Sequence, residues 1–376
     1  MSHVKIITFH AVPNYGAVMQ AYAMCRAVES LGHDVELIDY APSDTTFSTE
    51  EMEKFKSFID EYIPLTPKKI TCAEELCEMD TDYFICGSDQ IWNLSMRAVR
   101  ENFNAYFLCF EHDARLISYA ASTGGTTIPD DLHAPVKKAL ARFSAISVRE
   151  PESVYDIRGV TDKPIHTTLD PTLLCKSFPE HELGARFPEE YIVVYSLQTN
   201  PILIDTIRKV KKHLNVPIVS IGKKPAPLAD ISITDLHPGE WTTAIQKSLF
   251  VITNSFHGTV FSIKYHKQFA SIPLLRKRSK HKCKIEEKLF KLGMPDFVTC
   301  LNAELRHKRI KGNLSPKNSR IKNILHICGL ENRFIEHAQD ISCLMDFIPY
   351  GDVELKLEKE IEESFSFLKN SLSSAQ

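Results

Sequence analysis

The segment from Asn254 to Phe261 contains the residues of this chain that are best suited to catalysis. The imidazole of His257 can take up and release a proton near neutral pH, which general acid–base catalysis requires. An apolar run at 249–253 precedes it and predicts a buried parallel strand, and residues 260–265 predict the first turns of a helix. Open α/β sheets bind ligands at the carboxyl ends of their strands, where the new helix would offer N–H groups to an anion. The alternative is that His257 only caps the helix.

Polar residues follow other apolar runs as well. Arg149 comes directly after the run at 145–148, and its planar guanidinium can hold a carboxylate or phosphate through two hydrogen bonds. An ion pair with a neighbouring glutamate is the alternative for this arginine. The turn Asn14-Tyr15-Gly16 opens a helix after the first strand, where a phosphate or sugar could bind. This turn lacks the full glycine pattern of a dinucleotide site.

Alternating strand and helix patterns must position these residues, and they predict parallel sheets covered on both faces. The first series begins with a strand pattern at 4–9, and after a polar stretch near 176–190 a second begins with a strand pattern at 192–196. The sequence therefore predicts an α/β fold of two Rossmann-like domains facing a cleft. We expect them at residues 1–180 and 186–335, with a helix within 340–376 packing back on the N-terminal domain.

Composition places the chain among ordinary globular proteins. It has 376 residues, of which 43% are apolar and 25% charged. No apolar run approaches the roughly 18 residues that span a bilayer, and the amino terminus lacks the charged and apolar regions of a signal peptide. Ten cysteines occur without a CxxC pair or a Cys/His cluster at zinc spacing. This pattern indicates reduced thiols in a cytoplasmic protein and predicts that no metal is bound.

Charge is distributed unevenly along the chain. Residues 264–324 contain seventeen Lys and Arg and four Asp and Glu, a net charge of +13, whereas the whole chain carries −3. Such a segment is typical of contact with a phosphorylated ligand, an acidic lipid surface or nucleic acid. Nucleic acid is the weakest option because the segment shows no known binding module and few aromatic residues. We expect peripheral contact with anionic membrane through 264–324, at the inner face of the membrane, or alternatively a solvated insertion.

Six strings in the same order resemble the polysaccharide pyruvyl transferase family. They are residues 14–22 (NYGAVMQAY), 82–93 (DYFICGSDQIWN), 118–122 (SYAAS), 147–150 (SVRE), 169–174 (LDPTLL) and 254–261 (NSFHGTVF). The resemblance runs from residue 4 to about 266 and resumes at 318–334. It implies a fold similar to GT-B glycosyltransferases. It also implies phosphoenolpyruvate as donor and, as acceptor, a sugar of a surface polysaccharide such as a capsule or exopolysaccharide, or of its lipid-linked precursor. The product would be a pyruvate ketal, formed with release of phosphate and without a further cofactor.

The resemblance and the residue chemistry together give a set of expected site residues. His257 and Asp89 are expected to be catalytic, with Asp89 accepting a proton from a sugar hydroxyl. The phosphoenolpyruvate site is expected to contain Arg149, Ser255, Arg320 and Gly258. The sugar acceptor is expected to contact Asn14, Tyr15, Gly16, Ser88, Gln90, Trp92 and Asn93. A core anchor is the alternative role for Trp92. Asp170, which precedes a proline, is interpreted as a turn residue at the domain edge.

Two departures from the family pattern affect these expectations. Some members have an Arg-Leu-His string where this chain has Ser255-Phe256-His257, so one expected cation is missing. Arg320 is the best candidate to replace it, because Ser319 and Arg320 are expected to open a helix. The stretch at about 267–317 is longer than usual and basic. A GT-B glycosyltransferase that uses a nucleotide sugar, and a non-catalytic relative that binds glycan or lipid, remain alternative functions.

Overall fold

The computed structural model describes residues 1–42, 49–276, 314–336 and 342–373, and within this part the strands form two separate parallel sheets. The first sheet has the strand order β2-β1-β3-β4-β5-β6. Its strands are β1 (His3–Ile7), β2 (Asp34–Leu37), β3 (Tyr83–Cys86), β4 (Arg115–Ala121), β5 (Ala145–Val148) and β6 (His166–Thr167). The second sheet has the order β11-β10-β7-β8-β9. Its strands are β7 (Ile192–Tyr195), β8 (Ile218–Ile221), β9 (Ile231–Ile233), β10 (Phe250–Thr253) and β11 (Gln268–Ser271).

Helices cover both faces of each sheet, as the apolar strands require. All four residues of β3, β7, β8 and β10 are buried, which is typical of parallel strands covered on two sides. The helices of the first series are α1 (Tyr15–Ser30), α2 (Thr49–Tyr62), α3 (Arg97–Glu101), α4 (Phe103–Tyr106), α5 (His133–Leu140), α6 (Pro151–Arg158) and α7 (Pro171–Leu174). Those that follow are α8 (Pro201–Leu214), α9 (Pro238–Lys247), α10 (Phe256–Lys264), α14 (Ser319–Cys328), α15 (Ser342–Met345) and α16 (Tyr350–Leu372). The prediction of two Rossmann-like halves is confirmed.

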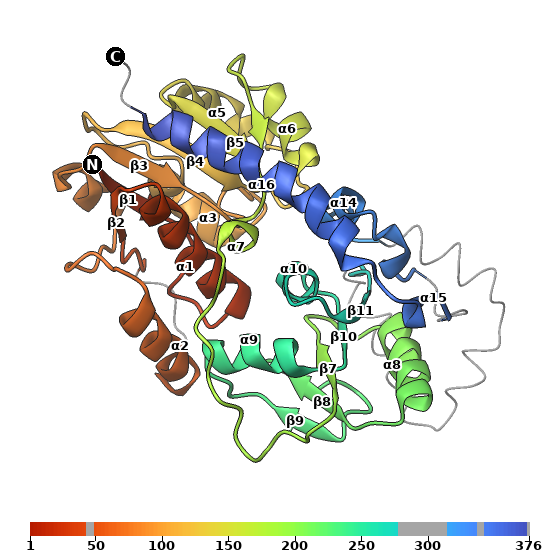
Figure 1. The fold of residues 1–376 in the computed structure, drawn as a ribbon. Coiled ribbons are helices and arrows are strands. Elements are labelled where there is room, and N and C mark those ends of the chain that lie inside the picture. Colours follow the sequence, from red (N-terminus) through yellow and green to blue (C-terminus); the bar gives the residue numbers. More distant parts are fainter. Residues whose placement is uncertain (43–48, 277–313, 337–341, 374–376) are drawn as a thin grey trace.

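The two halves share one apolar core. Buried side chains of α1 and α7 from the first half form a single cluster with those of α9, α10 and α14 from the second. The outer faces of the first and second sheets have separate cores. In Figure 1, α1, α7, α9 and α10 lie between the sheets. Because β1 leads into α1 and β10 leads into α10, the polar residues that follow these two strands are brought toward the boundary between the halves.

The last helix, α16, crosses from one half to the other (Figure 1). At its start, the Tyr350 hydroxyl donates to the carbonyl of Lys267 at 2.5 Å, in the second half. Farther along, the Ser364 hydroxyl accepts from the backbone N–H of Leu169 at 3.0 Å, in the first half. The helix therefore connects the halves by packing. The division into domains 1–180 and 186–335 stays a prediction.

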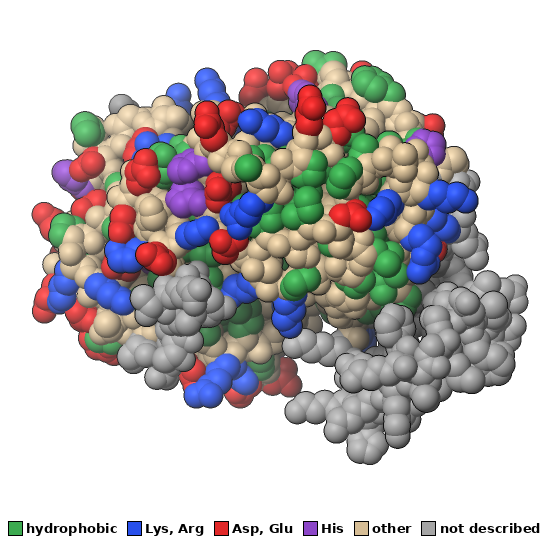
Figure 2. Space-filling model, turned by 90° about the horizontal axis from the view of Figure 1, so that it is seen from below, with side chains coloured by type: hydrophobic (Ala, Val, Ile, Leu, Met, Phe, Trp, Pro, Cys, Tyr) green, Lys and Arg blue, Asp and Glu red, His purple; other side chains and the backbone are tan. Residues whose placement is uncertain are grey.

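The expected basic insertion lies largely outside the described residues, which omit 277–313. Figure 2 shows one face of the molecule, on which Lys and Arg lie interspersed with Asp and Glu and no large area of a single sign is visible. Within the described residues, no helix is both long and apolar enough to cross a membrane. Peripheral membrane contact through 264–324 stays a prediction.

Candidate active site

A buried group of five charged or titratable side chains lies at the boundary of the halves. This charged cluster consists of Asp89, Arg149, Asp170, His257 and Arg320, each of which is at most 8% exposed. Asp89 and Arg149 follow β3 and β5, Asp170 caps α7, His257 lies in the first turn of α10, and Arg320 lies in the first turn of α14. Residues separated by more than 200 positions are thus brought into one site.

Arg149 is held by carboxylates on two sides. Its Nη1 donates to Asp170 Oδ2 at 2.7 Å and its Nη2 to Asp89 Oδ1 at 3.2 Å. Its Nε lies 3.5 Å from Glu150 Oε2, an ion pair without a hydrogen bond. The ion pair with a neighbouring glutamate is therefore present but is the weakest of the three contacts. Charge-assisted bonds of this kind fix the orientation of a guanidinium.

Asp170 is the centre of the cluster, which the sequence analysis did not foresee. One carboxylate oxygen accepts from the backbone N–H and the hydroxyl of Thr172 at 3.1 and 2.6 Å, and the other accepts from Arg149 and from the Ser88 hydroxyl. Burial alone would raise the pKa of Asp170, but His257 and Arg149 hold it well below its usual range. The Asp-Pro pair predicted only a turn. The one further signal was its place in a string that resembles the family.

His257 reaches this carboxylate from the second half. Its Nε2 lies 3.5 Å from Asp170 Oδ2, which is an ion-pair distance and too long for a hydrogen bond. This nitrogen is buried and has no hydrogen-bond partner among the described residues. The other side of the ring touches α1 at Gly16, where an added Cβ would lie 2.1 Å from His257 Nδ1. His257 thus has a polar atom available for a ligand and depends on the missing side chain of Gly16 for its position.

Both guanidinium groups of the charged cluster lie over the ring of Phe256. The Cζ atoms of Arg149 and Arg320 lie 4.6 and 5.4 Å from the ring centroid, within the range of cation–π attraction. Arg320 lies 3.9 Å from Asp89 Oδ1, and its Nε has no hydrogen-bond partner among the described residues. Burial, and then the charge of Arg149, lower the pKa of Arg320. A buried guanidinium with such weak compensation is suited to binding an anion.

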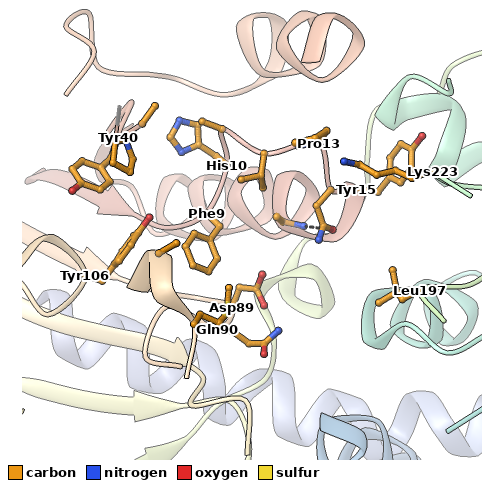
Figure 3. A pocket seen from close by; sticks show the side chains of 18 of the residues that line it. Phe9, His10, Pro13, Tyr15, Tyr40, Asp89, Gln90, Tyr106, Leu197 and Lys223 are labelled. Atoms are coloured by element: carbon orange, nitrogen blue, oxygen red, sulfur yellow. Dashed lines mark hydrogen bonds between the residues drawn. The ribbon is translucent and has the colours of Figure 1, made fainter. Parts of the chain in front are cut away.

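Asp89 links the charged cluster to an open cavity. Burial opposes its ionisation, but Arg149, His257 and Arg320 together lower the pKa of Asp89, so the carboxylate is ionised near neutral pH. Its backbone has φ of 64°, a left-handed conformation that aspartate tolerates better than most residues. The side chain is one of the walls of the cavity shown in Figure 3.

The cavity has a volume of about 530 Å³ and lies between loops of the two halves. The first half contributes the loops that follow β1, β2 and β3, and the second half contributes those that follow β7 and β8. Gln90 lines it beside Asp89, and His10 forms part of its wall. The Nε2 of His10 lies 3.3 Å from Asp39 Oδ1. Sequence reasoning did not single out this histidine, which precedes the Asn14-Tyr15-Gly16 turn by four positions.

Only some of the residues expected to bind the acceptor line the cavity. Asn14, Tyr15 and Gln90 line the cavity. Asn14 also caps α1 by accepting from the N–H of Gly16 at 3.1 Å. The Tyr15 side chain contacts mainly the boundary between the halves. Its ring stacks on Trp241 at 5.3 Å, and its hydroxyl donates to a carbonyl of the second half at 3.1 Å. Gly16 faces His257 instead of the cavity.

The remaining expected residues have structural positions. Trp92 is 1% exposed, stacks on Phe107 and donates from Nε1 to the carbonyl of Tyr106 at 3.2 Å, so its ring is a core anchor and is not placed to stack on a sugar. Asn93 is fully buried and donates to Gln90 Oε1 at 3.0 Å. The expectation that Trp92 and Asn93 contact the acceptor is therefore corrected: these side chains point into the protein and support the loop that carries Gln90.

Three residues that were expected to contact the donor or the acceptor make contacts within the protein that shape the site. The Ser255 hydroxyl caps α10 by accepting from the N–H of Gly258 at 3.3 Å. A Cβ at Gly258 would lie 2.3 Å from Thr253 Oγ1. This glycine therefore allows α10 to pack on β10, and its contact with the donor stays a prediction. The buried hydroxyl of Ser88 donates to Asp170 Oδ2 at 3.3 Å.

Comparison with solved structures returns proteins of low sequence identity. S. aureus MnaA in complex with UDP is 11% identical over 88% of this chain and 97% of that one, with a TM-score of 0.46. A UDP-GlcNAc 2-epimerase of Methanocaldococcus jannaschii is 12% identical over 86% and 99%, with a TM-score of 0.44. An alpha-glucosyltransferase in complex with UDP and a 13-mer DNA is 12% identical over 98% and 95%, with a TM-score of 0.49.

The two facing parallel α/β sheets make the fold GT-B-like. No curated protein sequence gives a significant match. The profile of the family described as polysaccharide pyruvyl transferase matches residues 14–274, a range that includes four members of the charged cluster and excludes only Arg320. The chain therefore belongs to the polysaccharide pyruvyl transferase family.

Proposed function

We propose that this protein transfers the pyruvate group of phosphoenolpyruvate to two hydroxyls of a sugar, forming a ketal and releasing phosphate. The sugar belongs to a surface polysaccharide or to a precursor of one. Family membership supports the class of reaction. The observation that carries the proposal is the buried Arg320 guanidinium, weakly compensated and adjacent to Arg149 and His257. Phosphoenolpyruvate is a cytosolic metabolite, so the proposed reaction is a cytoplasmic one.

The donor carries two anionic groups, a phosphate and a carboxylate, and the charged cluster can bind both. Arg149 already has two carboxylate partners, so it supports a bound anion without changing its own orientation. The buried Nε of Arg320 lacks a hydrogen-bond partner among the described residues, so this side chain gains the most from an anion. The amino terminus of α10, at Phe256 and His257, adds the positive end of a nine-residue helix. In this assignment Arg320 supplies the cation that is missing from position 255.

Ketal formation requires two proton transfers and the departure of phosphate. Each acceptor hydroxyl forms a bond from its oxygen to the central carbon of phosphoenolpyruvate, and the bond from that carbon to the phosphate oxygen breaks. Of the two hydroxyl protons, one is balanced by the proton added to the enol carbon, which becomes a methyl group, and the other leaves with phosphate. His257 delivers the proton to the enol carbon, and Asp89, which faces both the charged cluster and the cavity, orients a hydroxyl and receives its proton.

Thermal unfolding with and without millimolar phosphoenolpyruvate tests the donor assignment. A ligand that binds only the folded chain raises the midpoint, by about 2.7 kcal/mol of added stability at one hundred times its Kd. We expect the increase in the wild type and in Arg208→Ala, an exposed arginine on α8, and its loss in Arg320→Leu and His257→Ala. Phosphate release with candidate sugars then tests turnover. No increase with phosphoenolpyruvate, together with a clear one from a nucleotide sugar, would favour a glycosyltransferase, and no increase with any ligand would favour a non-catalytic relative.

A further inference from the structure

Helix α16 buries an apolar stripe that two serines, Ser364 and Ser371, interrupt. A serine in a helix interior can bond a carbonyl of the preceding turn, and Ser371 does so with the carbonyl of Phe367 at 2.8 Å. Ser364 is 2% exposed and makes a different contact, because its Oγ accepts from the backbone N–H of Leu169 at 3.0 Å. The hydroxyl of Ser364 therefore ties α16 to a distant part of the chain.

Leu169 directly precedes Asp170, and side chains bind both of its polar backbone groups. Its N–H donates to Ser364, and its carbonyl accepts from the Tyr119 hydroxyl at 3.1 Å. Burial, and then the charge of Asp170, raise the pKa of Tyr119, so its hydroxyl stays protonated and can donate near neutral pH. The carbonyl of Leu169 belongs to the peptide bond that leads into Asp170. Strand β4 and helix α16 together therefore fix the backbone from which this carboxylate extends.

The same helix contacts the two elements of the second half that complete the charged cluster. In its first turn, the Tyr350 hydroxyl donates to the carbonyl of Ser262 at 3.4 Å, on the helix α10 that carries His257. Farther along, Lys356 Nζ donates to the carbonyl of Cys328 at 3.5 Å, at the end of the helix α14 that supplies the second arginine of the cluster. Helix α16 thus bonds to α10, to α14 and to the residue before Asp170 as it crosses between the halves (Figure 1).

We propose that Ser364 is a positioning residue, which holds Asp170 in register with His257. It acts through the backbone of Leu169 and does not touch a substrate. This inference rests on the proposed function and deepens it, because His257 delivers the proton in that reaction. Asp170 Oδ2 lies 3.5 Å from His257 Nε2. A shift of about 0.3 Å toward the ring would make this contact a hydrogen bond, and a shift away would weaken it, so the position of the backbone at Asp170 matters to the imidazole.

The acid dependence of stability reports the position of the Asp170 carboxylate. The charged or titratable groups that face this carboxylate are Asp89, Arg149, His257, Arg320 and Tyr119. Burial would raise the pKa of Asp170, but His257 and Arg149 hold it well below its usual range. The resulting stability is present above the unfolded-state pKa near 4 and is lost as pH falls below it. A displaced carboxylate has a pKa closer to its ordinary value, so stability then falls less steeply in acid.

The experiment measures urea unfolding of the full chain from about pH 2 to pH 7 and binding of phosphoenolpyruvate by calorimetry. The test variant is Ser364→Ala, and the matched control is Ser371→Ala, because Ser371 is 8% exposed and its hydroxyl bonds within α16. Both variants gain the same helix propensity. We expect a less steep fall of stability in acid, and a Kd for phosphoenolpyruvate about threefold or more above wild type, in Ser364→Ala only. Tyr119→Phe, which removes the other contact of Leu169, should act in the same direction, and the double variant should show less than the sum of the two effects.

The outcomes separate this inference from the proposed function. A loss of stability in Ser364→Ala that is equal at every pH overturns the inference, even if phosphoenolpyruvate binds, because it shows a structural role alone. Additive effects of Ser364→Ala and Tyr119→Phe also overturn it, since the two hydroxyls would then not act through one residue. A less steep acid limb in Ser364→Ala, without binding of phosphoenolpyruvate to the wild type, supports the positioning of Asp170 and contradicts pyruvyl transfer. If the alanine variant does not fold, Ser364→Cys, whose sulfur is a weak acceptor, takes its place in the same comparison.

Discussion

Replacement of Gly16 by alanine provides the most direct test of how His257 is positioned. An added Cβ would lie 2.1 Å from Nδ1, 2.5 Å from Cγ and 2.9 Å from Cε1 of His257, whereas ordinary contacts begin near 3.4 Å. The imidazole or the start of α1 must therefore move by about 1 Å, and overpacking of this kind costs about 1–3 kcal/mol. Because Asp170 lies on the far side of the ring, the displacement changes the 3.5 Å contact between His257 and Asp170.

Gly351 is a matched control for this substitution. It is the second residue of α16, as Gly16 is the second residue of α1, and an added Cβ would meet nothing within 4 Å. Alanine in a helix is favoured over glycine by up to about 1 kcal/mol, so Gly351→Ala is expected to be neutral or stabilising. The difference between the two variants then reports the steric overlap at His257, about 1–3 kcal/mol in urea unfolding.

The functional effect of Gly16→Ala should exceed its effect on stability. A misplacement of about 1 Å in a catalytic group can reduce turnover by about a hundredfold. We expect phosphate release from phosphoenolpyruvate to fall by about this factor, with Gly351→Ala unchanged. Equal stability and equal activity of the two variants would refute the reasoning, because it would show that the space beside the imidazole is not limiting.

Three further predictions follow from the buried charges. Arg320→Leu should keep the unfolding free energy within about 1 kcal/mol of the wild-type value, because the guanidinium is weakly compensated. The same variant should no longer be stabilised by phosphoenolpyruvate. A loss of unfolding free energy above about 3 kcal/mol in urea would contradict this prediction. Asp170→Asn should cost about 3–5 kcal/mol at pH 7, because it removes the shortest of the three carboxylate contacts of the buried Arg149. Since the pKa of Asp170 is lowered, wild-type stability is present above the unfolded-state pKa near 4 and falls with pH below it, and the variant should show a flatter acid limb. Burial, and then the charge of the neighbouring His181, lower the pKa of His237 to about 4. Stability present above about pH 6.5 is therefore lost as pH falls toward 4. His237→Asn, which can still cap α9, should remove about 1–2 kcal/mol of that pH dependence, and an unchanged profile would contradict it.

The sequence predicted the parts of the structure that depend on local pattern. Apolar runs identify buried strands because both faces of a parallel sheet are covered, and the residue after a strand must lie near the sheet edge. Arg149 and His257 could therefore be placed near the cleft. The direction of a side chain after a strand is not local information: Trp92 follows β3 by a few residues and points into the core, whereas Asp89 of the same loop faces the cavity.

The central role of Asp170 could not be predicted because it depends on how the halves meet. Its carboxylate gains its partners from β5, from the loop after β3 and from α10 of the other half. The Asp-Pro pair alone predicted a turn, and the structure shows that Asp170 caps α7. Arg320 is separated from His257 by the basic stretch, and only the packing of α14 on α10 brings its guanidinium to the Phe256 ring.

The path of α16 gives the chain a topology in which the second half is an insertion within the first. The chain leaves the first half after α7 and returns along α16, where Arg115 Nη1 donates to the carbonyl of Ser373 at 3.1 Å and so ties the last described residue to the first sheet. A single proteolytic cut between α7 and β7 would therefore leave α16 covalently attached to the second half while it packs on the first. An isolated fragment of residues 1–180 would lack the Ser364 hydroxyl that pairs with the N–H of Leu169. The smallest fragment that completes the first half must be discontinuous in sequence.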